Sequence, residues 1–106
     1  MASRKITMDI VEIHKKSSFI SSVVRKDGLD WTDAETAEYE VFNQVGETVG
    51  IGTLTKSDDN KSFELVIPSD LTTKWDRKKK YLTTIRVVNS ENGFNSVVRE
   101  IEFIVK

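Results

Sequence analysis

Residues 81–105, YLTTIRVVNSENGFNSVVREIEFIV, decide the fold of this chain. Alternate residues of the first half form one mainly apolar face, namely Tyr81, Thr83, Ile85 and Val87, while Arg86 lies on the other. Asn92-Gly93 follows, a pair that favours the tight turn of a β-hairpin. In the second half the inward line is Val97, Arg99, Ile101, Phe103 and Val105, and the outward line is Val98, Glu100, Glu102 and Ile104. The stretch predicts two antiparallel strands with one buried face.

The same two-residue period continues upstream. Phe63, Leu65 and Ile67 alternate inward until Pro68, which ends the strand because proline cannot donate to a β-ladder. Ala37, Tyr39 and Val41 alternate with Glu38 and Glu40, as in an antiparallel strand with one solvated face. Residues 19–24 predict another strand, ended by Asp27-Gly28. Residues 49–54 predict a weaker one, in which Gly50 and Gly52 mark a bulge, an edge or a close backbone approach.

The first strand has an irregular pattern. Ile6, Met8 and Ile10 predict a buried face that alternates with Asp9. Val11 and Ile13 then continue the apolar pattern on the other parity. We therefore expect a bulge or a switch between sheets at this point.

One short helical turn is expected near 69–77. Ser69 or Asp70 can cap it, and Leu71 and Trp75 stand four residues apart on one face. Trp31 and Trp75 are predicted to be core or crossover anchors.

About seven strands with a single helical turn predict an all-β chain, because such strands hide their apolar faces by stacking as two sheets. The length of 106 residues fits one domain, residues 1–106. We predict an antiparallel β-sandwich, with a closed barrel as the structural alternative.

The composition predicts no chemistry of a catalytic, cofactor or metal site. The chain has no cysteine and one histidine, His14, so no nucleophile–base set or structural zinc site can be assembled. The acidic stretch of Asp30, Asp33, Glu35, Glu38 and Glu40 is expected to be solvated, and Asp58-Asp59-Asn60 is expected to form an ordinary turn rather than a calcium site. The net charge of −1 provides no general field for nucleic acid or an anionic membrane. No signal peptide or membrane-spanning segment is predicted.

The sharpest charge feature is a basic cluster, which we take as the candidate interaction surface: Lys74, Arg77, Lys78, Lys79 and Lys80. It can contact an acidic protein face, or it can be a solvated loop that keeps an edge strand from pairing. Both interpretations are favoured over binding of nucleic acid. A further hypothesis is self-association, in which the basic cluster of one copy contacts the acidic outward residues of a strand in a second copy.

The order from Phe63 to Val105 resembles the small immunoglobulin-like sandwiches of phage virion proteins, such as N-terminal domains of baseplate upper proteins and neck or tail accessories. The shared features are Ile67-Pro68, a helical turn with Trp75, Tyr81 opening a strand, and the Asn-Gly turn. Tyr81 also resembles a tyrosine corner, whose phenol bonds to backbone near the preceding crossover. The chain departs from the pattern in lacking a cysteine pair and in carrying Lys78-Lys79-Lys80 where relatives often have a glycine.

The resemblance implies an immunoglobulin-like fold and no enzymatic activity. We predict a structural or interaction module of a phage or prophage virion (baseplate, neck, tail or head accessory), located in the virion or, during assembly, in the bacterial host cytoplasm. Its partners would be other virion proteins or copies of itself, with no cofactor, no membrane and no nucleic acid. The alternative is a carbohydrate-binding or protease-inhibiting sandwich that works through its end loops.

Overall fold

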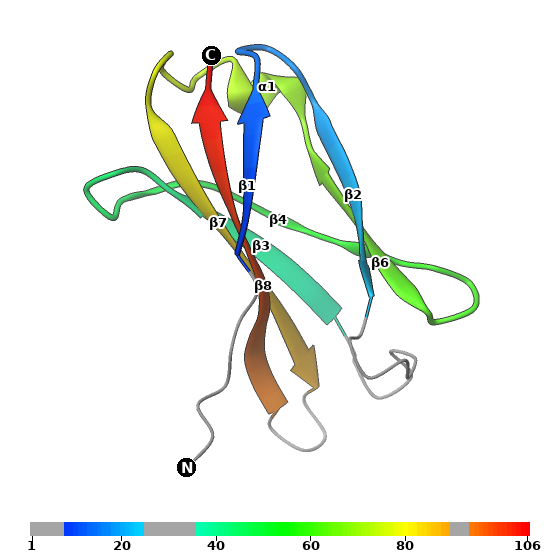
Figure 1. Cartoon of the computed structure of the whole chain (residues 1–106). Helices are drawn as coiled ribbons and strands as arrows, with labels where there is room; N and C mark the ends of the chain where they lie inside the picture. Colours follow the sequence, from blue (N-terminus) through cyan, green and yellow to red (C-terminus); the bar gives the residue numbers. More distant parts are fainter. Residues whose placement is uncertain (1–7, 25–35, 90–93) are drawn as a thin grey trace.

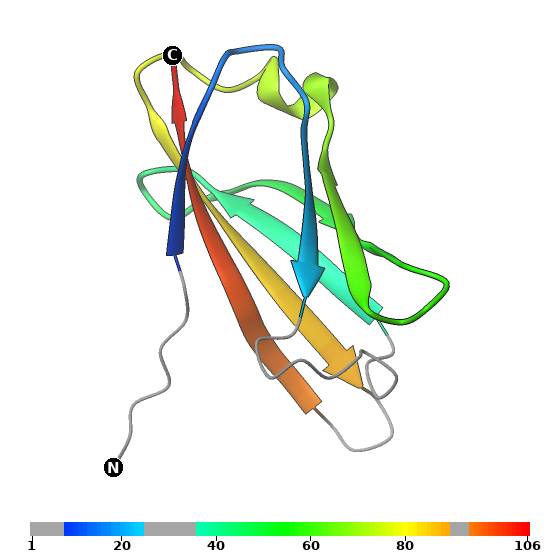
Figure 2. The same ribbon diagram turned by 45° about the vertical axis from the view of Figure 1, so that its right-hand side comes forward.

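Two β-sheets packed face to face make up the computed structural model, which describes residues 8–24, 36–89 and 94–106 (Figure 1). Within these ranges the elements are β1 (Met8–Ile13), β2 (Phe19–Val24), β3 (Thr36–Phe42), β4 (Thr48–Thr53), β5 (Thr55–Lys56), β6 (Ser62–Ile67), α1 (Ser69–Thr72), β7 (Lys80–Asn89) and β8 (Phe94–Val105). The large sheet has the order β1-β8-β7-β3-β4 and the small sheet β2-β6-β5. Figure 2 shows the open sandwich from the side, so the barrel alternative is wrong.

The strand directions differ from the prediction at one place. β1 runs parallel to β8, whereas the other paired strands are antiparallel. The predicted candidates Asp27-Gly28, Asp30, Trp31, Asp33, Glu35 and Asn92-Gly93 lie outside the described residues. Asn89 is nevertheless opposite Phe94, so β7 and β8 are neighbours as the hairpin prediction requires.

The core consists of the inward lines of both sheets. The predicted inward residues of β3, β6 and β7 are all buried, and β8 contributes Ile101, Phe103 and Val105. Apolar area removed from water contributes roughly 25 cal/mol per Å² to folding, so these lines supply the main driving force. The period-two predictions for these strands are confirmed.

The N-terminal half of β8 departs from its predicted alternation. The register shifts between Ile85 and Arg86, so that Ile85 is opposite Arg99 and Arg86 is opposite Val97. Val98 is the extra residue and packs against the core, although it was predicted to face outward. A bulge explains the error, because it places one unpaired residue in the strand and reverses the alternation beyond it.

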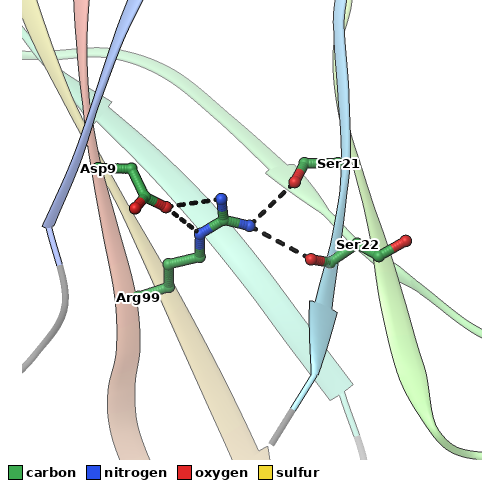
Figure 3. A network of polar contacts seen from close by, with 4 residues as sticks. All are labelled: Asp9, Ser21, Ser22 and Arg99. Atoms are coloured by element: carbon green, nitrogen blue, oxygen red, sulfur yellow. Dashed lines mark hydrogen bonds and ion pairs between the residues drawn. The ribbon is translucent and has the colours of Figure 1, made fainter. Parts of the chain in front are cut away.

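The prediction for β1 is wrong in phase. Met8 and Ile10 are 47% and 67% exposed, and the register from Met8 opposite Glu100 to Ile13 opposite Val105 has no bulge. The inward line contains Asp9, together with Val11 and Ile13. Asp9 faces inward because Arg99 of β8 donates to its Oδ2 from Nε at 2.9 Å and from Nη2 at 2.7 Å (Figure 3).

Both glycines of β4 lie where another chain segment approaches closely, as predicted. A methyl group on Gly52 would overlap the ring of Tyr39, its cross-strand neighbour, and one on Gly50 would lie 2.7 Å from Leu71 Cδ2. Burial raises the pKa of the Tyr39 phenol. β4 is also an edge strand, with a register shift between Val41 and Phe42 of β3.

The predicted helical turn exists but is shorter than expected. α1 spans Ser69–Thr72, its N-cap residue is Pro68, and no side chain caps it, so the capping role predicted for Ser69 or Asp70 is wrong. Thr72 Oγ1 instead donates to Ser17 O at 2.7 Å and joins the helix to the β1–β2 turn.

Trp75 follows α1 and anchors the end of the core, as predicted. It is 1% exposed, and its ring stacks on Tyr81 with centroids 4.7 Å apart. The Tyr81 hydroxyl accepts a hydrogen bond from the Asp76 amide at 2.8 Å. This bond from a strand start to backbone five residues upstream is a tyrosine corner, so that prediction is confirmed.

Candidate functional site

Three segments that are far apart in the sequence meet at one end of the sandwich: the β1–β2 turn, the crossover from α1 to β7, and the C-terminus (Figure 1). Ser17 O accepts from Thr72, and the Lys106 amide donates to Ile13 O at 2.9 Å. The crossover is tied to β8 because the Lys78 amide donates to Val105 O at 2.7 Å and the Val105 amide donates to Lys79 O at 3.0 Å.

These segments carry many cations. We call this surface the basic end, and it comprises Lys15, Lys16, Lys74, Arg77, Lys78, Lys79, Lys80 and Lys106. Those eight residues are half of the 16 lysines and arginines of the chain. The sequence predicted the five residues from Lys74 to Lys80 as a group. The other three join them only through the hydrogen bonds above.

Two of these cations have ion-pair partners. Lys80 Nζ lies 3.5 Å from Glu102 Oε1, and Lys106 Nζ lies 2.7 Å from Glu12 Oε2. The hydrogen bond and the charge of Lys106 lower the pKa of the Glu12 carboxyl. The other six cations form no ion pair with any carboxylate of the described residues. They are therefore available to a partner.

The backbone that presents these charges has two residues in the left-handed region. Lys78 has φ of +66° and Lys16 has φ of +74°. This conformation costs a non-glycine residue roughly 1–2 kcal/mol. Lys78 is thus a lysine in a backbone conformation that glycine adopts more readily.

A shallow pocket of about 480 Å³ opens beside the crossover, between it and the β3–β4 turn. Its rim carries Lys74, Lys79 and Lys80 from the crossover, with Gln44 and Val45 from the turn. Val45 is 77% exposed. The side chain of Asn43 stabilises the β3–β4 turn, because its Oδ1 accepts hydrogen bonds from the amides of residues 45 and 47 at 3.1 and 2.9 Å.

The floor of this pocket is formed by Trp75 and Tyr81, which are only 1% and 6% exposed. A sugar or an unstacked base needs an exposed aromatic face on which to lie. The other lining side chains are three ammonium groups, the carboxylate of Asp76, two amides and two valines. Because the three ammonium groups outnumber the one carboxylate, this lining suits a carboxylate flanked by apolar atoms.

The remaining predicted candidates lie apart from this end or are used locally. Glu38 and Glu40 are on the outer face of the large sheet, and Glu40 accepts from Thr48 Oγ1 at 2.6 Å. Asp59 Oδ1 accepts from Ser57 Oγ at 2.7 Å and from the Lys61 amide at 3.1 Å, bonds that lower the pKa of its carboxyl. These bonds are those of an ordinary turn. His14 is exposed in the β1–β2 turn.

Within the described ranges, no group of three histidine or acidic side chains is placed to hold a metal ion. In the same part of the chain no helix has the length and apolar composition needed to cross a membrane.

Comparison with known proteins identifies the fold. No protein-family model matches this chain, and no curated protein matches it. CopC from Methylosinus trichosporium OB3b is 16% identical, with 92% of this chain and 83% of CopC covered and a TM-score of 0.52. The NK cell receptor NKp44 is 8% identical, with coverages of 94% and 99% and a TM-score of 0.55.

A third similar structure is the catalytic module of the pneumococcal glycogen-degrading virulence factor SpuA. It is 14% identical with a TM-score of 0.54, and the match covers 91% of this chain but 12% of that one. Identities this low show the fold alone. The immunoglobulin-like β-sandwich is thereby confirmed, while none of these names is that of a virion protein.

Proposed function

We propose that this chain is a non-enzymatic interaction domain that binds an acidic surface of another protein through its basic end. The observation that carries the proposal is the convergence of eight cations from three segments, six of them without an ion-pair partner in the described residues. Clustered charge of one sign speeds the encounter with an oppositely charged partner and excludes like-charged ones.

The chemistry of the pocket favours a protein over the other anionic partners. Exposed Val45 lies beside the ammonium groups, and no exposed ring is available among the lining residues for stacking a base or a sugar. The carbohydrate-binding alternative loses support for the same reason. A protein surface supplies both the carboxylates and the apolar atoms that this rim can contact.

The absence of enzymatic activity is part of the proposal. The single histidine is exposed in a turn, and the carboxylates of β3 face solvent on the outer side of the sheet. Glu40 is hydrogen-bonded to Thr48 of the neighbouring strand, and within the described residues neither it nor Glu38 is paired with the histidine as an acid–base mechanism requires.

The virion assignment belongs to this proposal as its narrower form. It is supported by the resemblance in strand spacing and by a fold that suits assembly through protein contacts. An immunoglobulin-like fold serves many functions, so it adds no weight to one kind of particle over another.

The test is binding of a dye-labelled, glutamate-rich peptide with interspersed valines, followed by fluorescence anisotropy. The double variant Lys74→Gln/Lys79→Gln removes two pocket cations. The matched control Lys56→Gln/Lys61→Gln makes the same change of charge near the β5–β6 loop. At about 0.2–1 kcal/mol for each exposed ion pair, we expect the first variant to bind roughly 2- to 30-fold more weakly than wild type.

The control variant should bind as wild type does. Equal weakening in both variants would show attraction by overall charge and would contradict the proposed surface. A DNA duplex that binds more tightly than the peptide through Lys74 and Lys79 would replace the protein partner with nucleic acid.

A further inference from the structure

The sequence of β2 itself lacks the features that usually protect an edge strand, and one side chain from the other sheet, Arg99, reaches its free edge. β2 pairs with β6 alone among the described strands, and its register with β6 is continuous from Phe19 opposite Ile67 to Val24 opposite Ser62. Its sequence, FISSVV, contains no charge and no proline. Natural edge strands are usually blunted by lysine, proline or a bulge, because an unprotected edge pairs with other strands.

The outer face of β2 is also apolar. Ile20 and Val24 are 64% and 62% exposed, and Ile20 is opposite Val66, which is 38% exposed. These side chains form a small stripe that runs to the edge of the sheet. A strand added at this edge would cover them.

The contact of Arg99 shows which backbone groups of β2 point to the free edge. Arg99 Nη1 donates to Ser22 O at 3.3 Å and to Ser21 Oγ at 3.0 Å, and its guanidinium lies on the side of β2 away from β6 (Figure 3). In an antiparallel ladder, alternate residues direct both backbone groups to the same side. Ile20, Ser22 and Val24 therefore present their amides and carbonyls at the free edge.

We propose that two copies of this chain pair through β2, antiparallel and centred on Ser22, to join their small sheets into one continuous sheet. Ile20 of each copy then lies opposite Val24 of the other, and Ser22 lies opposite its own counterpart. The two three-stranded sheets become six strands. The carbonyl of Ser22 exchanges Arg99 for the amide of the second copy, while Asp9 and Ser21 still hold the guanidinium.

A second copy is the occupant that this edge fits. With the twofold axis at Ser22, Ile20 of each copy contacts Val24 of the other, so both exposed apolar residues of the strand have an apolar neighbour. A register centred on Ser21 would place Ile20 opposite a serine instead.

This contact uses a surface other than the basic end, so each proposal can fail alone. The β2 pair is apolar and backbone-bonded, and its strength should change little with salt. Contacts of the basic end should weaken as salt rises.

Sedimentation velocity over a wide range of protein concentrations tests the pairing. We expect a monomer–dimer equilibrium for wild type, loss of the dimer in Ile20→Lys, and its retention in the control Ile51→Lys. Ile51 lies on the edge strand β4 and is 73% exposed, so the control makes the same change at a similar site. Thermal melts of both variants check that the exposed positions leave folding intact.

The double variant Ile20→Lys/Val24→Glu tests the register. In the proposed pair, the new cation of each copy lies directly opposite the new anion of the other, so the dimer should return and become salt-sensitive. Failure to return would contradict the register. A wild-type chain that stays monomeric throughout, or an Ile20→Lys dimer as strong as wild type, would overturn the pairing.

Amide hydrogen exchange identifies the occupant. Slow exchange at residues 20, 22 and 24 that appears only as the dimer forms supports the second copy. Protection of these amides at every concentration would show that the chain covers its own edge, and the proposal would then be wrong.

Discussion

Trp75 shows what a single residue contributes to the end of this sandwich. It is 1% exposed and stacks on Tyr81. Its ring centroid lies 5.5 Å from that of Phe103, and the Phe103 ring contacts Phe19 edge-on. Its indole Nε1 is buried and has no hydrogen-bond partner in the described part of the chain. The ring therefore stabilises the core by packing alone.

Replacing Trp75 separates packing from polarity. We expect Trp75→Ala to lower the free energy of unfolding by about 3–5 kcal/mol, because it removes a large buried ring. Trp75→Phe should cost clearly less, since it keeps an aromatic ring and removes an unpaired donor. Urea denaturation of the three proteins measures both values. Equal losses in the two variants would mean that the ring retained by phenylalanine contributes nothing to the packing of this site.

Asp9 and Arg99 form the polar link between the sheets. They come from β1 and β8, and Arg99 continues to β2 of the other sheet. Asp9→Ala and Arg99→Ala should each lower the free energy of unfolding by roughly 1.5–3 kcal/mol, the range for hydrogen bonds to charged groups. The double variant should cost less than the sum, because each single change leaves the other group unpaired. A strictly additive cycle would show that the pair contributes nothing.

At the scale of elements, β4 depends on its glycines. Gly52 is covered by the Tyr39 ring, which is buried in the core, whereas Gly50 faces the flexible end of the Leu71 side chain. The same substitution should therefore have different effects at the two positions.

We expect Gly52→Ala to lower the free energy of unfolding by about 1–3 kcal/mol, since the Tyr39 ring must move. Gly50→Ala should be near neutral, because a small shift of Leu71 is offset by roughly 0.5–1 kcal/mol of backbone entropy saved in the unfolded chain. Thermal unfolding compares the two. A larger loss at Gly50 would contradict the assignment of the close contact to Tyr39.

At the scale of the whole molecule, charge is unevenly distributed. The net charge of −1 conceals an end on which eight cations meet and six lack an ion-pair partner in the described residues. Their mutual repulsion destabilises the folded state, and added salt screens it.

Salt should therefore raise the midpoint of thermal unfolding. The rise should be smaller in Lys74→Gln/Lys79→Gln than in wild type, because fewer cations remain to be screened. The control Lys56→Gln/Lys61→Gln should respond to salt as wild type does. Scanning calorimetry at several concentrations of sodium chloride measures these shifts, and an equal response in all three proteins would argue against repulsion at the basic end.

The sequence by itself determined the inward lines of β3, β6 and β7, the end of β6 at Pro68, and the tyrosine corner. These features depend on the two-residue period of a strand and on residue types at one place in the chain. It also identified the five cations from Lys74 to Lys80, since they are neighbours in the sequence.

Only the tertiary structure decided which face of β1 is buried and which other cations join the basic end. Asp9 turns inward because it is bonded to Arg99, a residue 90 positions away in the sequence. The β1–β2 turn likewise meets α1 through a hydrogen bond between residues that are 55 positions apart. The alternating pattern of a strand predicts that a carboxylate faces solvent, because a buried charge loses its hydration. That prediction fails where a residue distant in the sequence supplies an opposite charge and hydrogen bonds in place of water.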